Sequence, residues 1–178
     1  MNPMLKPFLL SFAVAAAGFA LAPALGQTSA LKGHNSNAPI DVASDRIEVQ
    51  DRADRAIFSG NVVVRQSQLT LTAGRLTVAY SNSGGIEIRR IDATGGVTVK
   101  SPSETARGDF GIYDLDRKLI TLVGGVVLTR GDSRVNGARL VLDLDSGRAV
   151  MDGGGPPGTT NQGGRVTGTF TVPQGRGG

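Results

Sequence analysis

The chain has 178 residues, no Cys, no Trp, only six Phe and two Tyr, and a formal net charge of +4. Without cysteine there is no disulfide scaffold and no lipid-modified cysteine anchor, so an aliphatic core alone must hold the fold. The basic residues are scattered and aromatic stacking platforms are missing, which argues against nucleic acid as a partner.

The first 26 residues have the pattern of a cleaved signal peptide. Lys6 precedes an apolar run at 8–22, and Ala24-Leu25-Gly26 offers small residues at the positions that a signal peptidase reads. The alternative is an uncleaved membrane anchor, but the run is shorter than the ~20 residues of a membrane-spanning helix. We therefore expect export, with cleavage near Gly26.

A polar segment at 27–38 is predicted to be a flexible leader, and a β domain follows it over 39–152. Apolar and polar residues alternate with period two there, as in Leu76-Thr77-Val78, which is typical of strands with one buried and one solvated face. Turn signals such as 81–85 and 131–133 separate the runs. We predict about ten to twelve short strands.

A glycine-centred motif recurs along this domain. It reads IFSGNV at 57–62, DATGGV at 92–97 and TLVGGV at 121–126, with a degenerate copy, VMDGG, at 150–154. A step of about 30 residues indicates stacked units that bury their apolar faces against one another. Two all-β architectures fit: an antiparallel jellyroll-like stack of hairpins, or a parallel β-helix. The compact turns favour the antiparallel arrangement.

The composition changes after residue 152. Residues 153–178 are rich in Gly, and Pro156-Pro157 interrupts any strand ladder. An alternating segment at 165–172 within this tail is predicted to form one last edge strand.

Several of these segments resemble the OstA-like domain, a family of periplasmic lipopolysaccharide transport proteins. The resemblance covers about 39–152, and it is carried by the ordered series IDVASDRI at 40–47, AIFSGNVVV at 56–64 and TLVGGVVL at 121–128. The Gly- and Pro-rich insert at 153–164 departs from the family pattern. The resemblance implies an all-β, open, twisted β-jellyroll of stacked antiparallel strands, whose apolar interior groove carries the acyl chains of lipopolysaccharide (lipid A).

The resemblance also implies the partners. Members of the family are expected to form a bridge between two membranes. The N-terminal edge would meet an inner-membrane bridge component, the C-terminal edge would meet the outer-membrane translocon, and copies would self-associate end to end. Unpaired strand edges suit such joints, because strand addition continues a sheet from one chain into the next.

Elementary energetics support an apolar groove for such a cargo. An acyl chain of about a dozen carbons costs on the order of 10 kcal/mol to expose to water, at ~0.8 kcal/mol per CH₂. A groove of Val, Ile and Leu shields the chain without directional bonds that would hold it in place. We predict that the lipid-binding lining consists of alternating apolar side chains: Ile40, Val42, Ile47, Val49, Phe58, Val62, Val64, Leu69, Leu71, Leu76, Val78, Ile88, Phe110, Ile112 and Leu122. The alternative is that each is ordinary core.

Arginines are candidates for a phosphate-binding rim of that groove, because guanidinium groups pair well with phosphate. The predicted rim residues are Arg46, Arg75, Arg89, Arg90 and Arg139. The alternative is that they lie on solvated outer faces of strands.

No catalytic or metal site is predicted, and no cofactor. Asp114-Leu115-Asp116 and Asp143-Leu144-Asp145 offer too few oxygens for calcium and are better explained as turns. The single His, His34, falls in the predicted leader, and no nucleophile–base pair or phosphate loop is present. Three other functions stay open: a membrane-anchored sibling of the same bridge, a lipid-free structural β-solenoid, and a β-helical enzyme acting on polysaccharide.

Overall fold

The structure is a computed structural model that describes residues 34–82, 84–154 and 164–171. The predicted signal peptide and the residues 27–33 of the predicted leader lie outside the described residues. Within the described ranges, no helix is long and apolar enough to cross a membrane. The elements are β1 (Asp41–Ala43), β2 (Arg46–Gln50), the short 3₁₀ helix η1 (Asp51–Ala53), β3 (Arg55–Gln66), β4 (Leu69–Ser81), β5 (Glu87–Lys100), β6 (Glu104–Asp114), β7 (Leu119–Arg130), β8 (Ser133–Asp143), β9 (Ala149–Asp152) and β10 (Thr167–Thr169).

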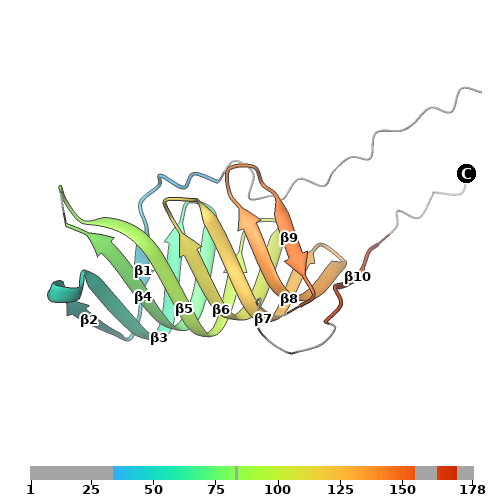
Figure 1. Cartoon of the computed structure of the whole chain (residues 1–178), viewed down its shortest axis with the longest axis horizontal. Helices are drawn as coiled ribbons and strands as arrows, with labels where there is room; N and C mark the ends of the chain where they lie inside the picture. The colour runs from blue at the N-terminus through green and yellow to red at the C-terminus, as the bar shows by residue number, and fades with distance from the viewer. Residues whose placement is uncertain (1–33, 83, 155–163, 172–178) are drawn as a thin grey trace, which may run out of the picture.

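All ten strands belong to one antiparallel sheet with the order β1-β3-β4-β5-β6-β7-β8-β10 (Figure 1). At one end β1 and β2 pair with the two halves of β3, and at the other end β10 and β9 pair with the two halves of β8. This arrangement confirms the predicted antiparallel stack of hairpins and rules out the parallel β-helix. The strand expected at 165–172 is present as the three-residue β10.

The long strands bend sharply near their midpoints, so the sheet folds over on itself (Figure 1). The register shifts between Ser59 and Val62, between Thr94 and Val97, and between Val123 and Val126, and these intervals contain the recurrent glycines. Gly60, Gly95 and Gly124 have φ angles of 78°, 82° and 85°, which side-chain-bearing residues rarely adopt. The repeated motif of the sequence therefore marks the fold line of the sheet.

Folding divides the sheet into two layers. The β2–β9 layer contains the strand halves that pair outward to β2 and β9, such as residues 75–81 and 119–123. The β1–β10 layer contains the halves that pair outward to β1 and β10, such as residues 62–66 and 126–130. The core lies between the layers and is almost entirely aliphatic: Leu76, Leu122 and Leu140 are each 0% exposed.

Opposite the fold line, the two layers meet through a side-chain contact. The Tyr113 hydroxyl, from the β2–β9 layer, donates a hydrogen bond to Oε1 of Gln66, from the β1–β10 layer, at 2.9 Å. Gln66 in turn donates through Nε2 to the carbonyl oxygens of Ser36 and Ala38, and His34 Nε2 lies 3.2 Å from Gln66 Oε1. Residues 34–38 of the predicted leader thus lie against the domain, because the backbone of this segment satisfies the amide of buried Gln66.

Candidate functional site

The strand register sorts the side chains into inner and outer rows that run across the whole sheet. Residues paired across neighbouring strands point to the same face. One inner row crosses the β2–β9 layer from end to end through Ile47, Phe58, Leu76, Ala93, Gly111, Leu122, Leu140 and Met151. A second inner row beside it contains Val49, Ala56, Val78, Ile91, Tyr113, Ile120, Leu142 and Ala149.

The structure brings most of the predicted lining residues into the interior. Seven of them are buried between the layers in one apolar cluster: Val62, Val64, Leu69, Leu71, Leu76, Val78 and Leu122. Ile40, Val42, Phe58 and Ile88 are partly buried against that cluster. In the middle of the molecule, these side chains fill the interior with one another.

The interior opens at the N-terminal end of the sheet. An apolar hollow of ≈ 250 Å³ lies there, and five of the predicted residues, Val42, Val49, Phe58, Val78 and Ile88, line it. Ile47 and Val49 are 55% and 56% exposed because β2, on which both lie, pairs with no strand other than β3 in the described part of the chain. This end presents a continuous apolar surface that leads into the core.

Four further residues complete the hollow: Asp51, Ala56, Tyr80 and Ile86. Two of them carried a signal in the sequence, because Tyr80 continues the alternation of Leu76 and Val78, and Ile86 alternates with Ile88. The other two could not be predicted from the alternation: Ala56 is small, and Asp51 belongs to the short helix η1, which has no periodic pattern in the sequence. Ile86 is 75% exposed, so an apolar side chain projects into solvent at the mouth of the hollow.

Tyr80 is the polar group of this hollow. Partial burial of its ring and the neighbouring carboxylates of Asp51 and Asp54 raise the pKa of Tyr80 above its ordinary value. Its hydroxyl lies 3.5 Å from Asp51 Oδ1 and is the donor of that contact. The hollow therefore has a neutral lining, with a single carboxylate at its edge.

Phe110 and Ile112 were predicted to line the groove, and this prediction is wrong. The register of β6 slips between Arg107 and Phe110, so the inward positions beyond the slip are those of Gly111 and Tyr113. A Cβ on Gly111 would meet Val97 and Leu122, which shows that this residue faces the core. Phe110 and Ile112 consequently face outward, and Phe110 is 55% exposed.

The predicted phosphate rim is also corrected. Arg46, Arg75 and Arg139 belong to one outer row of the β2–β9 layer, whose other members are Ser59, Thr94, Phe110, Val123 and Asp152. Successive side chains of a strand point to opposite faces of the sheet. Each of these three arginines directly precedes a residue of the inner row, so its side chain points away from the interior.

The other two predicted rim arginines form ion pairs with carboxylates of this chain. Arg90 binds Asp92 on the outer face, with 2.8 Å between Nη2 and Oδ1. Arg89 donates from Nε to Asp116 Oδ2 at 2.8 Å, beside the turn between β6 and β7. These partners raise the pKa of both guanidinium groups and hold them at the surface.

The paired aspartates form turns, as the sequence indicated. Asp114 Oδ1 accepts a hydrogen bond from the Arg117 backbone, and Asp143 Oδ1 accepts two, from Asp145 and Ser146. Among the described residues, no group of three or more His, Asp or Glu side chains gathers as metal ligands would. The feature that the fold positions best is therefore the apolar interior with its open N-terminal end.

Comparison with known proteins agrees with this architecture. Residues 41–148, from the first residue of β1 to the residue before β9, match the family described as LptA/(LptD N-terminal domain) LPS transport protein. An uncharacterised protein of Rhizobium meliloti (strain 1021) is 35% identical over 160 residues, which cover 82% of this chain and 86% of that protein. The lipopolysaccharide export system protein LptH of Pseudomonas aeruginosa is 35% identical over 71 residues, which cover 39% of this chain and 41% of the relative.

A solved structure shares the fold. The crystal structure of LptH from Pseudomonas aeruginosa, described as the LptA homologous periplasmic component of a conserved lipopolysaccharide transport device, matches with a TM-score of 0.67 at 19% identity. The match covers 78% of this chain and 99% of the LptH chain, which confirms the predicted open, antiparallel jellyroll-like sheet. With the family match over most of the sheet, these findings show that the chain belongs to the LptA/LptD N-terminal domain family of lipopolysaccharide transport proteins.

Proposed function

We propose that the protein is a periplasmic carrier that shields the acyl chains of lipopolysaccharide between the two layers of its folded sheet. The observation that supports this most directly is the continuity of the inner rows. They run from the exposed Ile47 and Val49, through the hollow at Phe58 and Val78, into the buried core. An acyl chain that enters at this end exchanges water for aliphatic side chains, at ~0.8 kcal/mol per CH₂.

Admitting a chain beyond the hollow requires the two layers to separate. Among the described residues, no backbone hydrogen bond joins the layers on the side opposite the fold line. The contact there is the cluster of hydrogen bonds around Gln66. The bends at Gly60, Gly95 and Gly124 are then the hinge about which the layers open.

The two ends of the sheet are the proposed joints of a bridge. Among the residues that the structure describes, nothing pairs with the outer edge formed by β1 and β2 or with the outer edge formed by β9 and β10. We assign the N-terminal edge to an inner-membrane bridge component, the C-terminal edge to the outer-membrane translocon, and both to end-to-end pairing of copies. Cleavage of the predicted signal peptide would release the exported protein into the periplasm, whereas an uncleaved segment would make the protein the membrane-anchored sibling of the same bridge.

One observation favours a second candidate function. Leu76, Leu122 and Leu140 are 0% exposed, so the middle of the interior is closed to solvent, as in an ordinary core. A structural β-solenoid that carries no lipid would have the same middle, and it would use only its edges.

Site-specific photo-crosslinking in cells separates the two functions. A photoreactive amino acid in place of Phe58 lies in the inner row, and one in place of Ile57 lies in the outer row of the same strand. We expect a lipopolysaccharide adduct from position 58, detected on a blot, and none from position 57. No adduct from either position, with the protein folded and exported, would favour the lipid-free solenoid.

A further inference from the structure

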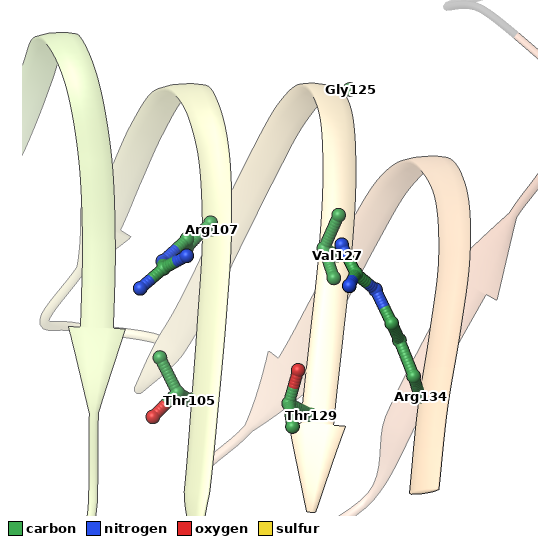
Figure 2. A pocket seen from close by; sticks show the side chains of 6 residues that line it. All are labelled: Thr105, Arg107, Gly125, Val127, Thr129 and Arg134. Atoms are coloured by element: carbon green, nitrogen blue, oxygen red, sulfur yellow. The ribbon is translucent and has the colours of Figure 1, made fainter. Parts of the chain in front are cut away.

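The outer face of the β1–β10 layer carries a second hollow, of ≈ 460 Å³, on the opposite side of the sheet from the core. It is lined by Thr105 and Arg107 of β6, Gly125, Val127 and Thr129 of β7, and Arg134 of β8 (Figure 2). Figure 2 shows the arginine side chains of β6 and β8 and the two threonines on the same side of these strands. Neither the family assignment nor the proposed lipid path uses this hollow.

The strand register builds the hollow from two neighbouring outer rows. Thr105 pairs with Thr129, and Thr129 pairs with Arg134, so two hydroxyl groups and a guanidinium lie side by side. Arg107 pairs with Val127 in the next row, so a second arginine lines the same hollow. Gly125 has open space where a side chain would stand, and this leaves the hollow open toward the fold line.

The charges of this face are strongly one-sided. The row that contains Thr105 and Arg134 also contains Arg65 and Lys100, and its one carboxylate, Asp41, is at the far edge on β1. Within the described part of the chain, the guanidinium groups of Arg107 and Arg134 form no ion pair or side-chain hydrogen bond.

The acidic side chains at the border of this face do not neutralise either arginine. Asp109, at the bend of β6, and Asp132, in the turn before β8, form no ion pair with either one. By contrast, Arg89 and Arg90 on the other layer are each held by an aspartate. Two unneutralised guanidinium groups at one hollow attract an anion, because their charges otherwise repel each other.

We propose that this hollow binds a phosphate group. Guanidinium groups bind phosphate oxygens in pairs of parallel hydrogen bonds, and threonine hydroxyls donate to the remaining oxygens. The phosphate comes either from a soluble phosphate or sugar phosphate, or from the headgroup of an anionic lipid. Because the sheet separates the hollow from the interior, the site is independent of the lipid path proposed above.

Titration of the full-length protein with inorganic phosphate at about 0.1 M ionic strength tests the site. We expect saturable shifts of the backbone amide NMR signals of Thr105, Thr129 and Arg134. The Arg107→Gln/Arg134→Gln double variant should weaken binding by about tenfold or more. Both side chains are exposed, so the variant should keep the circular dichroism spectrum and the melting temperature of the parent.

Arg65→Gln is the matched control, because Arg65 is exposed on the same outer face but lies on β3, three strands from β6. It should change the affinity by less than about twofold, since exposed charges at that distance are screened. Arg134→Lys keeps the charge and should still weaken binding, because an ammonium lacks the paired donors of guanidinium. Equal weakening by Arg65→Gln would overturn the proposal.

Sedimentation with vesicles distinguishes the two sources of phosphate. Binding to phosphatidylglycerol vesicles but not to phosphatidylcholine vesicles, lost in the double variant, would assign a lipid headgroup. Saturable binding of inorganic phosphate without sedimentation would assign a soluble phosphate. Absence of both would remove the site while leaving the crosslinking result at Phe58 unaffected.

Discussion

The middle and the N-terminal end of the sheet use the same inner row in opposite ways. Leu76 and Leu122 are 0% exposed, whereas Ile47, in the same row, is 55% exposed. The side chains are of the same type and face the same way, so chemistry does not explain the difference. The number of neighbouring strands does: a middle strand is flanked on both sides, and β2 is flanked on one. An edge position thus leaves exposed to solvent an apolar side chain that would be buried in a middle strand.

The largest expected effect comes from truncating one residue in each region. Leu76→Ala should lower the free energy of unfolding by about 2–5 kcal/mol, because it leaves a cavity in a filled core. Ile47→Ala should lower it by less than about 1 kcal/mol, since much of this side chain is already in water. Urea unfolding followed by circular dichroism measures both. Equal losses would show that the end is packed as the middle is.

A second comparison contrasts two neighbouring glycines at the fold line. Gly124 and Gly125 both have positive φ, but only a Cβ at position 124 would collide, with the Asp109 side chain. We expect Gly124→Ala to cost about 1–3 kcal/mol and Gly125→Ala about 1 kcal/mol. Thermal unfolding of the two variants gives the difference. A reversed order would mean that Asp109 moves aside freely and that the bend is held by other contacts.

A third comparison tests the hydrogen bonds of Gln66, which join the two layers on the side opposite the fold line. Gln66→Leu should cost about 1–3 kcal/mol, because it leaves the Tyr113 hydroxyl and the carbonyl groups of Ser36 and Ala38 without their partner. Gln68→Leu, in the adjoining turn, is the control, and its exposed side chain should contribute less than about 0.5 kcal/mol. Hydrogen exchange at residues 36–40 should accelerate only in the first variant; unchanged exchange would show that residues 36–40 are held independently of Gln66.

The smallest expected effect concerns pH and the turn after β8. Backbone N–H groups of Ser146 and Asp145 lower the pKa of Asp143 below its usual value. Its folded pKa is depressed, so its ionised form stabilises the protein above about pH 4, and this contribution is lost as the pH falls through the folded value. Asp143→Asn should therefore be less stable than the parent at about pH 7, with a smaller gap at about pH 3. Urea midpoints at both pH values measure it, and a gap that does not change with pH would contradict the assignment.

Sequence analysis alone predicted the all-β class, the antiparallel pairing and the positions of the turns, and it identified the recurrent glycine motif. These features are local: alternation fixes which residues share a face, and a compact turn fixes the direction of the next strand. The family resemblance could also be read from motifs in order along the chain. Most of the predicted interior residues, from Val62 to Leu122, followed from the same alternation.

Which face a residue occupies beyond a bend could be read only from the three-dimensional structure. A one-residue slip at a bulge exchanges the two faces, so Phe110 and Ile112 moved outward while Gly111 and Tyr113 took the interior. The same holds for three features that are built by residues from different strands: the hydrogen bonds at Gln66, the open N-terminal end and the arginine hollow on β6–β8. They depend on how strands stack and where the sheet ends, and that information is not contained in the period of any single segment.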